Sequence, residues 1–169
     1  SGNTTASSNV AIGFKALLTN ITGNNSVAIG DSALRLFTGS TPNVAVGFSA
    51  LTANVSGNEN TAVGSYALDA TTTDNCTAVG YNAGGANVSG RFSTFVGQAA
   101  GIKSTGSHCT FIGSGTGYQN TVTGDGVTCV GREAGHYVIG AYNTFLGYQS
   151  GFAVNSGTHN TAIGFQAGD

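Results

Sequence analysis

One glycine returns at intervals of 16 to 18 residues along the whole of this 169-residue chain. Each copy ends a short apolar run such as Val-Ala-Ile-Gly or Thr-Phe-Val-Gly. A period this short and regular is typical of a solenoid, in which one structural unit stacks on the next copy of itself. We therefore predict a single repeat domain over residues 1–169. Its coils are centred on Gly13, Gly30, Gly47, Gly64, Gly80, Gly97, Gly113, Gly131, Gly147 and Gly164.

Composition excludes several classes of protein. Charged residues make up only 7% of the chain and the net charge is −2, so nothing indicates nucleic acid as a partner. No apolar run approaches the roughly 20 residues of a membrane helix, so we expect no direct membrane insertion. The three cysteines match no metal-ligand spacing and predict no disulfide framework. The chain begins Ser-Gly and ends within a repeat, so we expect it to be a piece of a longer protein.

Positions in each coil are numbered here from the repeated glycine, so that −3, −2 and −1 precede it. Position −3 is Val or Thr and position −1 is always Ile, Val or Leu. These two positions share one face of a strand, and we predict that they point into the coil. Position −2 is Ala, Phe or Cys and would then face a neighbouring chain. The expected trimer-interface residues are Ala62, Ala78, Phe95, Phe111, Cys129 and Phe145.

Two further columns refine the predicted coil. Position +4 is Leu in the first four coils and Gly in the last six. Glycine there suggests a turn with positive φ, and we expect the leucine coils to turn differently. A weaker apolar column nine residues before the glycine predicts a second strand. It comprises Ile21, Val55, Val88, Val122 and Val138. The predicted fold class is an all-β solenoid, a parallel β-roll with two short strands per coil.

Asparagine recurs at position −4, at Asn9, Asn43, Asn60, Asn143 and Asn160. Stacked asparagines predict an amide ladder in which each side chain bonds to the next coil. We expect the ladder to break where another residue occupies the column. Those positions are Ser26, Cys76, Ser93, Cys109 and Val127.

Several segments resemble the head repeats of YadA-like trimeric autotransporter adhesins, and also repeats of phage-type tail-fibre and trimeric surface-fibre proteins. Asn-Val-Ala-Val-Gly at 43–47 and Asn-Thr-Ala-Ile-Gly at 160–164 carry this resemblance, which extends over all ten coils. The coils here are longer than the adhesin repeats. The resemblance implies a homotrimer of parallel, left-handed β-rolls, located outside the cell, on a cell surface or in a virion fibre.

The expected function is non-enzymatic attachment to a cell-surface glycan or protein receptor, with no cofactor. One alternative is a passive shaft whose receptor-binding tip lies outside this chain. A second is an ice-binding solenoid that uses the threonine column from Thr61 to Thr161. A third is a glycan-degrading enzyme, which needs paired carboxylates in a cleft. The seven acidic residues lie at unrelated columns, so we expect no catalytic residues.

Candidate contact residues come from the turns. The coil between Gly113 and Gly131 is the longest, and extended loops on repeats are common binding places. Aromatic residues at position +1 could contact a sugar or a protein. The expected ligand contacts are Tyr118, Gln119, Asp125, Tyr81 and Tyr148. His108 and His159 share position −5 but lie three coils apart, so we expect no metal site.

Overall fold

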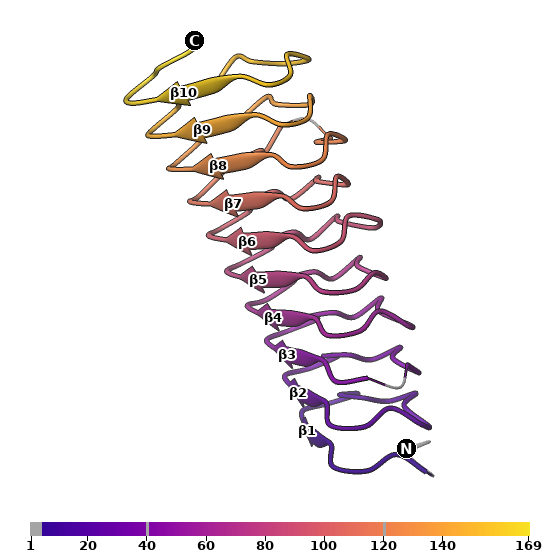
Figure 1. The fold of residues 1–169 in the computed structure, drawn as a ribbon. Coiled ribbons are helices and arrows are strands. Elements are labelled where there is room, and N and C mark those ends of the chain that lie inside the picture. The colour runs from indigo at the N-terminus through magenta and orange to yellow at the C-terminus, as the bar shows by residue number, and fades with distance from the viewer. Residues whose placement is uncertain (1–4, 40, 120) are drawn as a thin grey trace.

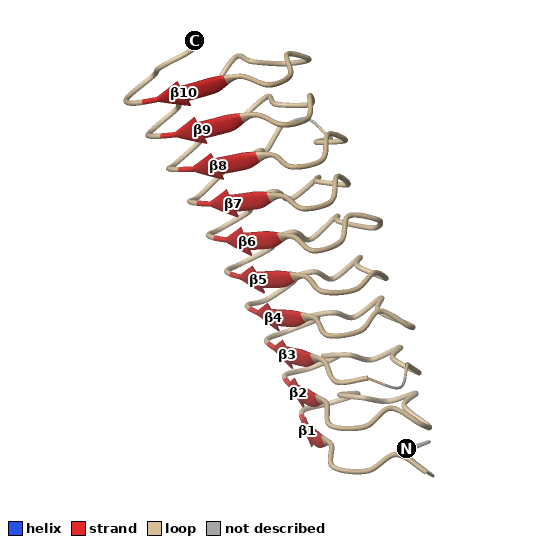
Figure 2. Ribbon diagram, viewed as in Figure 1, coloured by secondary structure: helices blue, strands red, loops and turns tan. Residues whose placement is uncertain are grey.

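The computed structural model describes residues 5–39, 41–119 and 121–169 as an all-β solenoid. Ten strands of three residues form one parallel sheet in chain order, one strand per coil (Figures 1 and 2). The strands are β1 (Val10–Ile12), β2 (Val27–Ile29), β3 (Val44–Val46), β4 (Thr61–Val63), β5 (Thr77–Val79), β6 (Thr94–Val96), β7 (Thr110–Ile112), β8 (Thr128–Val130), β9 (Thr144–Leu146) and β10 (Thr161–Ile163). The predicted β-solenoid is confirmed.

The strand register turns each sequence column into a row along the solenoid axis. Ala62 pairs with Ala78, and Val63 pairs with Val79, and the same in-register pairing joins all ten strands. Side chains at one position therefore lie one strand spacing apart, about 4.8 Å, along the whole rod. Any property shared by a column becomes a continuous stripe on one surface.

The two faces of the strands are inverted relative to the sequence prediction. Ala62, Ala78, Phe95, Phe111, Cys129 and Phe145 are all fully buried inside the single chain. They form its core together with the alanines at position +3, so they are not available to a neighbouring chain. Positions −3 and −1 face outward instead, as at Val79. The predicted interface residues are therefore wrong, because both strand faces are apolar and alternation alone does not identify the inner one.

The turn at position +4 has one conformation throughout the rod. Leu17, Leu34, Leu51 and Leu68 have φ between 48° and 51°, and the glycines that replace them have φ between 54° and 75°. The expectation that leucine coils turn differently is wrong. Leucine accepts the left-handed conformation because its side chain fills the core beside the small strand alanines.

The repeated glycine is required for two reasons. In all ten coils its φ lies between 128° and 137°, where residues with a Cβ are strained. In the first nine coils an added Cβ would also stand 2.4 to 2.7 Å from backbone atoms of the next repeated glycine. The close approach of successive coils thus depends on the missing side chain.

The predicted second strand does not form in the described part of the chain. Val122 and Val138 are buried, whereas Val55 and Val88 are about half exposed, and the backbone there follows irregular turns. Asparagine side chains compete for the local backbone groups in three coils. Asn54, for example, donates to the carbonyl of Gly57 at 2.9 Å and accepts from its N–H at 2.7 Å.

The amide ladder at position −4 is confirmed and is more continuous than predicted. Asn60 Oδ1 accepts from the N–H of Cys76 at 2.9 Å, and its Nδ2 donates to the carbonyl of Thr73 at 2.7 Å. Ser26 and Ser93 do not break the ladder, because each hydroxyl accepts the equivalent N–H of the next coil at 3.1 Å. The thiols of Cys76 and Cys109 also bond to carbonyls of the next coil. Coil stacking is thus reinforced inside the rod by short polar side chains.

Candidate functional site

The outward face of the sheet is an apolar strip, defined here as positions −3 and −1 of β1 to β10. Every −1 residue is Ile, Val or Leu, every −3 residue is Val or Thr, and neither position carries a charge. Exposed fractions reach 59% at Ile12, 41% at Val79 and 65% at Ile163. The strip thus combines an aliphatic row at −1 with a row of valine and then threonine at −3, and an uncharged surface of this kind is a candidate interaction site.

Aromatic rings border the apolar strip at the turns that follow several of the strands. Tyr66 packs edge-on against Phe48 at 5.2 Å and against Tyr81 at 6.0 Å between ring centroids. Near the C-terminal end Tyr148 stacks on Phe165 at 5.4 Å. All five rings are exposed, so they widen the apolar surface beyond the strands.

A polar hollow of about 280 Å³ lies beside three successive coils in the C-terminal half of the chain. It forms at position +2, where the row of side chains is interrupted by Ala99 and Gly115. The walls of the hollow are formed by Gln98, Ser114, Tyr118, Arg132, Glu133 and His136.

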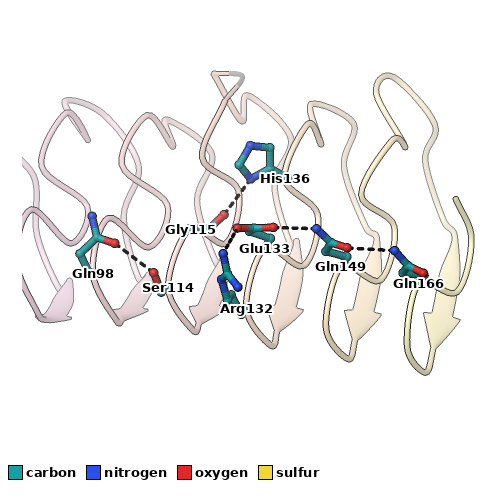
Figure 3. Close-up of polar contacts among 8 residues, drawn as sticks. All are labelled: Gln98, Ser114, Gly115, Arg132, Glu133, His136, Gln149 and Gln166. Atoms are coloured by element: carbon teal, nitrogen blue, oxygen red, sulfur yellow. Dashed lines mark hydrogen bonds and ion pairs between the residues drawn. The ribbon is translucent and has the colours of Figure 1, made fainter.

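Glu133 is held in place by a chain of polar contacts along the rod axis (Figure 3). Its Oε1 accepts from Arg132 Nη2 at 2.8 Å, and its Oε2 accepts from Gln149 Nε2 at 2.8 Å. Gln149 accepts in turn from Gln166 at 3.0 Å. The hydrogen bond from Gln149, followed by the charges of Arg132 and His136, lowers the pKa of Glu133 below its ordinary value. The carboxylate is therefore ionised and fixed in orientation near neutral pH.

Two of the residues that line the hollow, Tyr118 and His136, carry aromatic rings. The ring of His136 stacks on Tyr118 at 5.6 Å and on Phe152 at 4.9 Å between centroids, and Tyr137 packs edge-on against the stack. His136 Nδ1 lies 3.2 Å from the carbonyl oxygen of Gly115. Because a carbonyl only accepts, Nδ1 donates this hydrogen bond.

The structure brings together two of the five predicted contact residues. Tyr118 lines the hollow, and Tyr148 lies beneath the Arg132 guanidinium, whose Cζ is 5.7 Å from the ring centroid. Tyr81 is exposed at the border of the strip, far from the hollow in sequence. Asp125 accepts the backbone N–H of Ser107 at 2.7 Å and so joins two coils.

The remaining predicted contact, Gln119, has an exposed side chain, and its backbone N–H donates to the carbonyl of His136 at 3.0 Å. Sequence reasoning missed Arg132, Glu133 and His136 as a group. The one signal for them is Gly115, which replaces a side chain in the +2 column two rungs before Gln149.

The histidines and cysteines occupy separate places. His108 stacks on Phe92 at 5.1 Å, and His159 lies 5.1 Å from the ring of Tyr142. Within residues 5–39, 41–119 and 121–169, no group of three or more His, Cys, Asp or Glu side chains could hold a metal ion. The three cysteines are buried and free. Across the same ranges, no helix is long and apolar enough to cross a membrane.

Comparisons with known proteins yield no match to a protein-family model, to a curated protein or to a solved structure.

Proposed function

We propose that this chain is a non-enzymatic segment of an extracellular homotrimeric fibre that mediates or presents attachment to a cell surface. The observation that carries the proposal is the apolar strip, which runs along all ten strands without a charged residue. Covering such a surface removes apolar area from water at roughly 25 cal/mol per Å². The strip therefore favours association along the full length of the rod.

The best-matched occupant of the strip is another copy of the same chain. A partner must be straight, apolar and as long as the rod, and it must present side chains at the same spacing of about 4.8 Å. A second rod aligned in parallel meets all of these conditions, because its own strip has the same rows in the same register. In an oligomer with closed symmetry, the strip of every copy is covered in the same way.

Three copies are proposed because the strip is narrow and because the repeats resemble those of trimeric fibre proteins. A strip two strand positions wide suits several rods that converge on one axis, with the aromatic turns at its border closing the seam. The alternative of a passive shaft shares this assembly. It differs only in lacking a ligand site on these coils.

Light scattering after size-exclusion chromatography tests the assembly directly. The expected mass is three times the 16.7 kDa of one chain. The midpoint temperature of thermal unfolding should also rise with protein concentration, because association stabilises only the folded state. A mass of one chain together with a concentration-independent midpoint would overturn the proposed fibre.

A second candidate function, ice binding, is favoured by the orientation of the threonine column. Thr77 and Thr144 are exposed on the outward face, and the seven threonines from β4 to β10 form one row at the strand spacing. The row stands beside aliphatic residues on a parallel sheet in register, so its hydroxyl groups repeat at the strand spacing. Thermal hysteresis of the purified chain tests this function, and its absence at millimolar concentration rejects it.

A further inference from the structure

The polar hollow lies where the row of longer side chains at position +2 stops at Gly115 and Ala99. At position +2, Gln166, Gln149 and Glu133 follow one another with a hydrogen bond at each step (Figure 3). The next position toward the N-terminus is Gly115, where an added Cβ would stand 3.4 Å from Glu133 Cγ. Open space thus adjoins the fixed carboxylate, and a side chain at 115 would extend the row into it.

The charge of the hollow selects a neutral ligand. Arg132 and Glu133 form an ion pair at 2.8 Å, so the two side chains compensate each other. An anionic ligand would meet the carboxylate, and a cationic ligand would meet the guanidinium. A purely apolar ligand would leave polar groups without water or a partner. The remaining class is a neutral molecule that is rich in hydrogen-bonding groups.

The hydrogen-bonding pattern fits hydroxyl groups on adjacent carbons. Each oxygen of Glu133 accepts one hydrogen bond and keeps further acceptor capacity, while Arg132 retains N–H donors beyond the one used for the carboxylate. A hydroxyl group donates and accepts at once, so two neighbouring hydroxyls can bond to the carboxylate and the guanidinium together. Tyr118, His136 and Gln98 add an aromatic surface and further polar atoms to the lining of the hollow.

We infer that this hollow binds a single neutral pyranose residue of a surface glycan. The inference deepens the attachment role proposed above and rests on it, but the hollow is built within one chain. Its volume of about 280 Å³ lies just below the range of about 300 to 1,000 Å³ typical of small-molecule sites, so it suits no more than one sugar ring. Three chains would present three such sites, and avidity would strengthen attachment to a dense glycan surface.

Saturation-transfer NMR on the whole chain, with titration by calorimetry, tests the site. The probes are the methyl glycosides of glucose, galactose and mannose, with N-acetylneuraminic acid and glucosamine as charged comparators. At least one neutral glycoside should bind with a Kd of about 1 mM or below, and both charged sugars should bind at least tenfold more weakly. The Glu133→Gln substitution should weaken binding of the neutral glycoside at least tenfold.

Gly115→Gln is the second variant, because it fills the hollow with the side chain that the same row carries at Gln149 and Gln166. Those residues have φ of 53° and 50°, and Gly115 has φ of 68°, so the backbone accepts the change. We expect glycoside binding to be lost while circular dichroism and solution mass stay unchanged. Ser49→Gln is the matched control at position +2 of a distant coil, and it should bind as the parent chain does.

The outcomes separate this site from the fibre. A trimeric chain that binds no neutral glycoside overturns the sugar site and leaves the fibre standing. Glycoside binding by a monomeric chain supports the site and overturns the fibre. Equal binding by Gly115→Gln and the parent chain places any sugar elsewhere and overturns the inference, as does preferential binding of either charged sugar.

Discussion

The Cα atom of Gly101 lies against the ring of Phe95 in the same coil, so closely that a Cβ at 101 would stand 2.5 Å from two ring carbons. In the N-terminal coils the same two positions hold a leucine and a strand alanine, such as Leu34 and Ala28, and both are fully buried. The rod therefore keeps its core filled by exchanging volume between positions −2 and +4. Every strand phenylalanine goes with glycine at the turn, and every turn leucine goes with a strand alanine, while Ala78 and Ala162 also go with glycine.

This exchange predicts a strong coupling between the two positions. Phe95→Ala leaves a cavity and should cost about 3 to 5 kcal/mol, and Gly101→Leu should cost about 1 to 3 kcal/mol through overpacking. The double variant recreates the Ala28 and Leu34 arrangement, so its loss should be smaller than the sum by more than about 1 kcal/mol. Urea unfolding of the four proteins measures this. Simple additivity would contradict the volume exchange.

The repeated glycine should tolerate no side chain. In Gly80→Ala the new Cβ would meet the carbonyl oxygen of Gly97 at 2.6 Å, at a φ of 132°. Neither the neighbouring backbone nor the strained φ can relax cheaply, so we expect a loss of several kcal/mol. Gly115→Ala is the control, because its Cβ meets only Glu133 Cγ at 3.4 Å. Thermal unfolding measures both variants. Equal decreases in their midpoint temperatures would contradict the close approach of coils.

The ladder at position −4 predicts that serine substitutes for asparagine better than alanine does. Asn60→Ala leaves the N–H of Cys76 and the carbonyl of Thr73 without their side-chain partner, and it should cost about 1 to 3 kcal/mol. Asn60→Ser should cost less, since Ser26 already accepts the equivalent N–H at 3.1 Å. Denaturant midpoints of both variants check this order, and the reverse order would count against the ladder.

Cys129 predicts a loss of stability in alkaline solution. Burial raises the pKa of its thiol far above the ordinary value of 9.0. Above about pH 9 the folded chain still holds the thiol proton, whereas the unfolded chain releases it. The free energy of unfolding is therefore unaffected by this thiol below about pH 9 and decreases as the pH rises further. The loss of unfolding free energy between pH 7 and pH 10 should be smaller in Cys129→Ala than in the parent chain. Equal losses would contradict the effect of burial.

The solenoid architecture could be predicted from the sequence, but which strand face points into the core could not. The glycine period predicts the solenoid, the strand that ends at each repeated glycine and the asparagine ladder, because each depends on local spacing, whereas the predicted second strand does not form. The burial of Phe95 and exposure of Val79 could not follow from alternation, since both columns are apolar. Leucine at +4 occurs only in coils with alanine at −2, and every phenylalanine at −2 occurs with glycine at +4, which is the signal that pairs those columns in one core.

The hollow was beyond sequence reasoning for a different reason. It depends on an absent side chain at Gly115 and on three residues that reach it from the next coil, Arg132, Glu133 and His136. None of these forms a motif along the chain. Their meeting follows from the stacking register, which sets position +2 of one coil beside position +2 of the next.

The last prediction tests which strand face joins the chains. Val79 is 41% exposed on the apolar strip, so Val79→Asp should leave each coil folded but place one unpaired carboxylate per chain in the proposed seam. Burying such charges costs several kcal/mol, and their mutual repulsion adds to the penalty. We expect the Val79→Asp trimer to dissociate at a protein concentration at least tenfold higher than the concentration at which the parent trimer dissociates. Val88→Asp is the matched control, because Val88 is 52% exposed in the turns outside the strip and should keep the parent mass. Light scattering across a dilution series measures both variants, and an intact trimer in Val79→Asp would show that the strip is not the seam.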